Sequence, residues 1–91
     1  MQYLICYDIG EDKIRTRVMK YLSSFAWRVQ YSVFSCENTE KRMLRVKRRL
    51  LELTATSEKC MILIVPLCSA CQGKIWQKGA PIENAPQCII I

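Results

Sequence analysis

The apolar run from Cys60 to Val65 constrains the fold more than any other stretch of this sequence. All of its residues are apolar, and Pro66 follows directly. A strand without polar alternation is covered on both faces, because an open face would expose its large side chains to water. We therefore expect a sheet with helices against one face and a further cover against the other.

Two stretches have the spacing of amphipathic helices. The first is expected from about Lys13 to Phe25, with Asp12 as a candidate cap. Its apolar residues fall on one face: Ile14, Val18, Tyr21, Leu22 and Phe25. The second is expected from Asn38 or Thr39 to about Leu53. Its buried stripe comprises Met43, Val46, Leu50 and Leu53, widened by Leu44 and Leu51.

The other regular segments have the composition of strands. They are Met1–Ile9, Trp27–Cys36, Cys60–Val65, Lys74–Lys78 and the terminal Cys88–Ile91. Alternation within the second segment places Arg28 and Phe34 on the same side of a strand. Ser69–Gly73 is expected to be a turn or a short helical piece. The aromatic residues expected in the core are Tyr21, Trp27 and Tyr31.

These elements predict an α+β fold. We expect a ferredoxin-like split βαβ sandwich, with a four-stranded antiparallel or mixed sheet, two helices on one face and an added C-terminal strand. Met1–Ile9 and Cys60–Val65 are expected to be central, parallel neighbours in that sheet. Residues 1–79 would form the domain and residues 80–91 a tail.

The second sheet face needs a cover that two helices cannot supply, and a second copy of the chain is the simplest candidate. The tail supports this expectation, because Ile89, Ile90 and Ile91 would make an aggregation-prone edge if left free. Paired onto a partner's sheet, they would extend it by one strand. The alternative is that the tail folds back onto its own sheet. We predict a homodimer.

Composition narrows the class of partner. The chain of 91 residues carries a net charge of +6 and no histidine, which favours an anionic partner, nucleic acid first and an acidic membrane second. No stretch has the length and apolarity of a membrane helix or the features of a signal peptide. We therefore expect a cytoplasmic protein whose six cysteines are reduced.

The second predicted helix has an unbalanced charge. Its acidic residues are Glu40 and Glu52, whereas its basic residues are Lys41, Arg42, Arg45, Lys47, Arg48 and Arg49. A merely solvated helix usually balances the two signs. The pattern predicts a surface that follows the phosphate backbone of duplex DNA without reading its sequence. The alternative is an ordinary solvated face.

Two smaller features stay ambiguous from the residues alone. Asp8 lies where the first strand gives way to a loop, so it is either a turn residue or a metal ligand or general base held by the sheet. Cys68 and Cys71 form a C-x-x-C motif, which is half of a zinc site or a redox pair. Structural or incidental thiols are favoured, because zinc lacks two further ligands and no long helix follows the motif.

Several of these motifs occur together in one known family. They are Tyr7-Asp8-Ile9, the helical Arg15 and Arg17, Arg28-Val29-Gln30-Tyr31-Ser32-Val33-Phe34, and Ile64-Val65-Pro66-Leu67-Cys68. From Met1 to about Gly79 the chain closely resembles the CRISPR-associated protein two family. The Arg-x-Gln-Tyr-Ser-Val-Phe stretch is the specific part of the resemblance.

The resemblance implies a small ferredoxin-like homodimer that acts in spacer acquisition with the CRISPR integrase. It also implies a metal-dependent endoribonuclease or deoxyribonuclease activity. Asp8 would be the metal-binding acid, one from each subunit, holding Mg²⁺. The other residues that match positions tied to activity are Tyr7, Arg15, Arg17, Arg28 and Phe34.

Three hypotheses follow. The first is a CRISPR adaptation protein that binds DNA together with the integrase, with or without a catalytic role. The second is a free-standing Mg²⁺-dependent phosphodiesterase that acts on single-stranded RNA or on DNA. The third is a toxin-like messenger-RNA interferase of similar fold.

Overall fold

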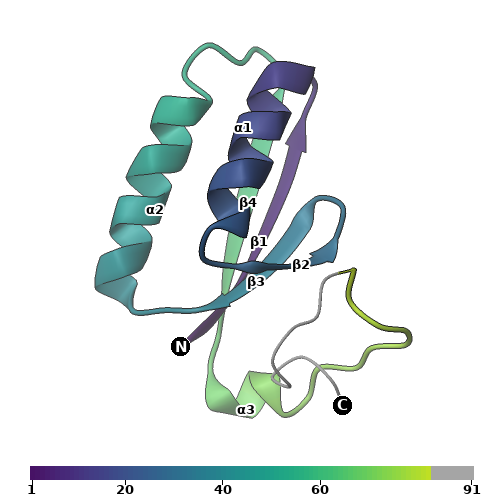
Figure 1. Cartoon of the computed structure of the whole chain (residues 1–91). Helices are drawn as coiled ribbons and strands as arrows, with labels where there is room; N and C mark the ends of the chain where they lie inside the picture. Colours follow the sequence, from purple (N-terminus) through teal and green to yellow (C-terminus); the bar gives the residue numbers. More distant parts are fainter. Residues whose placement is uncertain (83–91) are drawn as a thin grey trace.

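The computed structural model describes residues 1–82 of the chain. Along the sequence it forms β1 (Gln2–Ile9), α1 (Asp12–Ser23), β2 (Trp27–Gln30), β3 (Val33–Glu37), α2 (Glu40–Leu53), β4 (Cys60–Leu67) and α3 (Ser69–Gln72) (Figure 1). None of the helices in this part of the chain has the length and apolarity needed to cross a lipid bilayer.

The sheet has the strand order β2-β3-β1-β4, and every neighbouring pair is antiparallel. Helices α1 and α2 lie against one face of it (Figure 1). The predicted α+β, ferredoxin-like sandwich is confirmed. One part of the expected topology was wrong: β4 is antiparallel to β1 and lies at the edge of the described sheet, because β3 takes the other central position.

The core forms where β1 meets the two helices. The odd-numbered side chains of β1 are all buried: Tyr3, Ile5, Tyr7 and Ile9. Ile14, Val18 and Leu22 of α1 and Met43, Val46 and Leu50 of α2 pack over them. The central residues of both predicted stripes are thus buried as expected, and they cover one face of β1.

The segment predicted as one strand, Trp27–Cys36, is a hairpin. A turn at Tyr31 and Ser32 separates β2 from β3, and neither residue is the Gly, Pro, Asn or Asp that normally marks a turn. An irregularity between Arg28 and Gln30 shifts the pairing, so that Arg28 lies opposite Phe34. The alternation therefore placed this pair on one face correctly, although the two residues lie on different strands.

The predicted strand Lys74–Lys78 was wrong: residues 73–74 form a turn after α3, and residues 75–78 have no regular structure. The strand predicted to stop before Pro66 continues through it to Leu67, which an edge position allows because a proline there need not donate a ladder hydrogen bond. The predicted C-terminal strand, Cys88–Ile91, lies outside the described residues.

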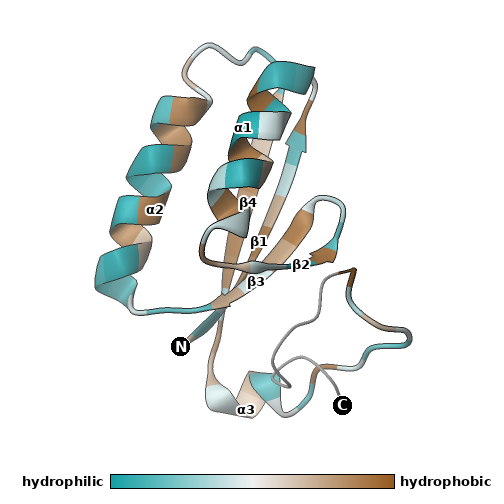
Figure 2. Cartoon of the chain, viewed as in Figure 1, coloured by the Kyte–Doolittle hydropathy of each residue, from teal (hydrophilic) through white to brown (hydrophobic). Residues whose placement is uncertain are grey.

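Three apolar residues expected in the interior are exposed. Leu44 and Leu51 of α2 are 61% and 72% exposed, and Tyr31 is 79% exposed in the hairpin turn. Figure 2 shows the resulting mixture of apolar and polar colour along α2. The stripe that packs on the sheet is narrower than the hydrophobic pattern suggested, which leaves apolar surface on α2 beside β4.

The loops at one end of the sheet are joined by the Glu11 carboxylate. It accepts hydrogen bonds from Ser57 Oγ at 2.6 Å and from the Glu58 amide at 2.9 Å. The Gly10 amide donates to the Lys59 carbonyl at 2.9 Å, and a side chain at Gly10 would approach Lys59 Cβ to 3.3 Å. These contacts fix the start of α1 against the loop that leads into β4.

The Glu11 contacts predict a pH-dependent stability. The hydrogen bond from Ser57, followed by that from Glu58, lowers the pKa of Glu11 below its ordinary value of 4.5. The stabilisation of the fold by the ionised Glu11 carboxylate is therefore complete above pH 4.5. It is lost as the pH falls through the lower pKa that Glu11 has in the folded state. Glu11→Gln should lower the Tm at pH 7, and the difference from the wild type should shrink on acidification.

Thermal unfolding followed by tryptophan fluorescence between about pH 7 and 3 measures this difference. Glu58→Gln is the matched control, since it removes one carboxylate from the same loop but keeps both hydrogen bonds to Glu11. An equal loss of Tm in the two variants at pH 7 would contradict the proposal that the hydrogen bonds of the Glu11 carboxylate stabilise the fold.

Candidate functional site

Asp8 lies on the sheet face opposite the helices. It is the penultimate residue of β1 and pairs with Met61 of β4, so the two side chains share a face. The same register places Cys6 beside Leu63 on that face. The sheet therefore holds the Asp8 carboxylate on the side away from the core.

This second sheet face differs from one end to the other. At the start of β1 it is closed: Gln2 and Ser35 are fully buried, and Gln2 Nε2 donates to Ser35 Oγ at 2.6 Å. At the end of β1 it is open, since Met61 is 50% and Leu63 is 51% exposed beside Asp8. The open half of the face thus combines exposed apolar side chains with a carboxylate.

The Asp8 side chain is exposed, and its carboxylate makes no hydrogen bond or ion pair within residues 1–82. Across the same residues, no three His, Cys, Asp or Glu side chains gather as a cation site. Mg²⁺ needs only one or two carboxylates when waters and phosphate oxygens complete its shell. Asp8 therefore fits this cation as one ligand, provided that a second carboxylate comes from another copy.

Two of the arginines from the predicted site meet on the other side of the sheet. Arg15 of α1 and Arg28 of β2 line an open hollow of about 250 Å³ against the hairpin turn. The full lining is Tyr7, Arg15, Thr16, Met19, Arg28, Tyr31 and Ser32. Two guanidinium groups beside an exposed tyrosine form a surface suited to a phosphate with an adjoining base.

Tyr7 and Phe34 support this hollow from below. Both are buried, and their rings stack with centroids 6.2 Å apart. The Arg28 guanidinium lies 5.8 Å from the centroid of the Phe34 ring, within the range of a cation–π contact. The Tyr7 hydroxyl donates to the Tyr31 carbonyl at 3.2 Å, so it fixes the hairpin turn.

The Tyr7 phenol stays protonated in this position. Burial raises its pKa, while the positive charges of Arg28 and Arg15 act in the opposite direction and only partly offset the burial. Tyr7 is also on the opposite face of β1 from Asp8. The two residues that are adjacent in the sequence therefore serve different surfaces.

Arg15 lies between the hollow that it lines with Arg28 and the end of the strand that carries Asp8. Its guanidinium donates to the Ile9 carbonyl at 3.0 Å and pairs with Asp12. Ile9 is the last residue of β1 and follows Asp8 directly. Arg15 is thus anchored at the end of the strand that carries the exposed carboxylate.

Arg17 lies apart from Arg15 and Arg28. It lines a separate hollow of about 320 Å³ along α1, together with Asp12, Lys13, Thr16 and Lys20. The structure therefore divides the predicted arginines between two surfaces. Tyr31, Ser32 and Met19 belong to the first hollow but were not predicted, since the hairpin turn that brings two of them there has no turn signal in the sequence.

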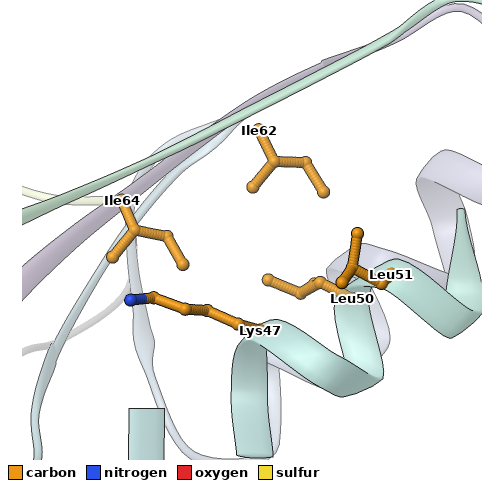
Figure 3. A pocket seen from close by; sticks show the side chains of 5 residues that line it. All are labelled: Lys47, Leu50, Leu51, Ile62 and Ile64. Atoms are coloured by element: carbon orange, nitrogen blue, oxygen red, sulfur yellow. The ribbon is translucent and has the colours of Figure 1, made fainter. Parts of the chain in front are cut away.

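All six basic residues predicted on α2 are exposed. Arg42, Arg45 and Arg49 follow the spacing of one helical flank, and Arg49 pairs with Glu52 at 3.3 Å. Lys47 lies on the opposite flank, where it lines an apolar groove of about 330 Å³ with Leu50, Leu51, Ile62 and Ile64 (Figure 3). The α2 basic surface thus consists of Lys41, Arg42, Arg45, Arg48 and Arg49, and Lys47 borders a different feature.

The chain matches known proteins along most of its length. The profile of the family described as CRISPR associated protein Cas2 matches residues 1–75. CRISPR-associated endoribonuclease Cas2 4 of Rhodospirillum rubrum is 39% identical over 83 residues, which cover 91% of this chain and 66% of that protein. CRISPR-associated endoribonuclease Cas2 1 of Chloroflexus aurantiacus is 33% identical over 93 residues, with 100% of both chains covered.

Solved structures agree with this match. Cas2 of Streptococcus pyogenes superposes with a TM-score of 0.73 at 26% identity, over 87% of this chain and 100% of that one. A chain in a partial Cas6-RT-Cas1–Cas2 complex superposes with a TM-score of 0.74 at 28% identity, over 93% of each chain.

The positions of Tyr7 and Asp8 predict unequal effects of their substitution on stability. Tyr7→Phe removes a part-buried hydrogen bond and should cost about 1 kcal/mol of unfolding free energy. Asp8→Asn removes an exposed charge and should change that free energy by less than about 0.5 kcal/mol. Urea unfolding at one fixed protein concentration measures both values. A loss for Asp8→Asn as large as that for Tyr7→Phe would show that the carboxylate has a structural role.

Proposed function

This chain belongs to the CRISPR-associated protein Cas2 family, and we propose that it is a homodimeric, Mg²⁺-dependent nuclease of CRISPR adaptation that binds DNA together with the integrase Cas1. The observation that carries the proposal is the position of Asp8. An exposed carboxylate without a partner in residues 1–82 lies on an open apolar sheet face, at the end of a central strand.

The open half of the second face supports the dimer. Met61 and Leu63 are half exposed there, and a second copy that packs on them would remove both from water. A two-fold contact through this patch brings together two equivalent surfaces. Because Asp8 is the cross-strand neighbour of Met61, the same contact would bring two Asp8 carboxylates toward its axis.

Two such carboxylates would complete the ligand set that one chain lacks. Mg²⁺ held between them would supply positive charge for a phosphate oxygen and lower the pKa of a bound water. The chain's own part is to hold the two Asp8 oxygens on rigid strands. Arg15, anchored on the Ile9 carbonyl, would bind a neighbouring phosphate at the same end of the sheet.

The α2 basic surface supports DNA binding. Its five cations lie exposed on one helix, against Glu40 and Glu52. Such a surface binds phosphates without reading bases, and a dimer would present two copies of it along a duplex. The neighbouring structure that contains both Cas1 and Cas2 supports an integrase as the partner.

The groove beside Lys47 supports the proposed place of the C-terminal tail. It lies between α2 and β4, whose outer edge pairs with no other strand of the described sheet (Figure 3). Its walls are Leu50, Leu51, Ile62 and Ile64. The terminal Ile89–Ile91 of a second copy would add a strand to this edge and bury its side chains in the groove.

A DNA-binding scaffold without catalysis is the second candidate, and a specific observation favours it. Tyr7 and Phe34, two of the residues tied to activity by resemblance, are buried supports rather than exposed reactive groups. Family membership also favours either role over a toxin-like interferase. Both candidates place the protein in the cytoplasm, where its target nucleic acid lies.

Cleavage of nucleic acid tests the role of Asp8. Purified wild-type protein should cut single-stranded RNA or double-stranded DNA with Mg²⁺ and not with EDTA. Asp8→Asn should lower the rate at least about 100-fold, because the remaining amide does not replace the charge of a carboxylate. Glu58→Gln, which also removes one exposed carboxylate but none that pairs with Arg15, is the control and should keep most of the activity. Equal rates for wild type and Asp8→Asn would favour the scaffold.

Charge reversal on α2 tests DNA binding independently of cleavage. Arg45→Glu with Arg48→Glu should weaken binding of a duplex at least about tenfold at moderate salt, and should flatten the decline of affinity with salt concentration. Lys74→Glu with Lys78→Glu changes the net charge by the same amount outside the helix. If both pairs weaken binding equally, the effect belongs to net charge and not to the α2 surface.

A further inference from the structure

Cys68 and Cys71 lie together on one helical turn. Cys68 follows β4 directly and caps α3, and its carbonyl accepts a hydrogen bond from the Gln72 amide at 2.9 Å. Side chains three residues apart on such a turn are neighbours. Both thiols are free and exposed, and Cys68 also lines an open hollow of about 330 Å³ with Met1, Glu37 and Gln72. The sequence favoured structural or incidental thiols, and the exposure of both side chains argues against the structural alternative only.

None of the other cysteines within residues 1–82 is both exposed and next to a second thiol. Cys36 is buried, and burial raises its pKa to about 11, so it stays a thiol at neutral pH. Burial also raises the pKa of Cys6 on β1. Cys60 is exposed, but it lies alone at the start of β4. A reactive pair within residues 1–82 is therefore confined to Cys68 and Cys71.

The proximity of the two side chains makes the two thiols of this pair unequal. The nearby amide of Cys71, and then its thiol, lower the pKa of Cys68. The same thiol contact and the charge of Cys68 raise the pKa of Cys71. The more acidic sulfur is the one that reacts first with an external disulfide, and its neighbour is placed to displace what it has bound.

We propose that Cys68 and Cys71 form a reversible disulfide site whose co-reactant is a small-molecule disulfide of the glutathione class. The Cys68 thiolate attacks one sulfur of the co-reactant, forms a mixed disulfide and releases one thiolate. The Cys71 thiolate then attacks the Cys68 sulfur and releases the second thiolate. Each released thiolate takes up one proton, so the two protein thiols are oxidised and one external disulfide is reduced to two thiols.

The hollow beside Cys68 gives the co-reactant access. It is open, and it is lined by Cys68 but not by Cys71. Met1 and Glu37 also line it, and the Met1 ammonium pairs with the Glu37 carboxylate at 3.8 Å. Zinc is the alternative occupant of a C-x-x-C motif, but residues 1–82 supply no third ligand beside the pair.

Peptide mapping of the full chain tests the proposal. Cys60, Cys68 and Cys71 lie on one tryptic peptide between Lys59 and Lys74, so Cys60→Ser is used as the reference. The reduced protein is incubated with oxidised glutathione in EDTA, quenched with acid and alkylated. The peptide should become lighter by two hydrogens, carry no stable glutathione and return to its reduced mass with dithiothreitol.

Two further variants assign the order of attack. Cys71→Ser in the reference should accumulate glutathione on Cys68, since no resolving thiol remains. Cys68→Ser should form its adduct on Cys71 severalfold more slowly. Separate adducts on both cysteines without an internal bond, a Cys68–Cys88 disulfide, or stoichiometric zinc on the protein as purified would each overturn the proposal.

Discussion

The alternation of side chains along β1 is the constraint on which the rest of the structure depends. β1 is paired on both edges, so its register is fixed, and a shift by one residue would exchange its two faces. Four odd-numbered residues bury themselves under the helices, and Asp8 must then point the other way. The burial of the odd-numbered residues thus sets the direction of the Asp8 side chain, although that side chain lies on the opposite face of the sheet from the core.

The same alternation explains why the candidate site has two parts. Tyr7 faces the helix side and supports the hollow of Arg15 and Arg28, whereas Asp8 faces the open side. The two parts approach one another only at the end of β1, where Arg15 holds the Ile9 carbonyl. In the proposed dimer, a nucleic acid would contact both parts by passing around this end of the sheet.

Helical periodicity revealed more of this fold from the sequence than strand patterns did. The central residues of the α1 and α2 stripes were predicted correctly, because each helix buries a face that its own spacing defines. The β2–β3 hairpin was missed, since its turn at Tyr31 and Ser32 contains no Gly, Pro, Asn or Asp and the irregular pairing preserves the alternation across the turn. The exposed Leu44 and Leu51 were missed for another reason: apolarity alone does not tell a core position from the wall of a groove. The exposure of Asp8 likewise could not be predicted from the sequence, because it depends on which residues of β4 lie beside it.

β4 connects these features, because it contributes to the core, carries an exposed outer face and has an unpaired edge in the described sheet. Its inner side chains Ile62 and Ile64 pack beside the core, its outer ones Met61 and Leu63 are half exposed, and its free edge borders the groove. A single described copy leaves both the outer face and the edge uncovered, and each is a liability in water. The proposed second copy covers the face directly, and its tail would cover the edge. A single second copy of the chain can therefore cover both the outer face and the edge of the apolar strand that begins at Cys60. The contact that covers the outer face is also the contact that would pair the two Asp8 carboxylates.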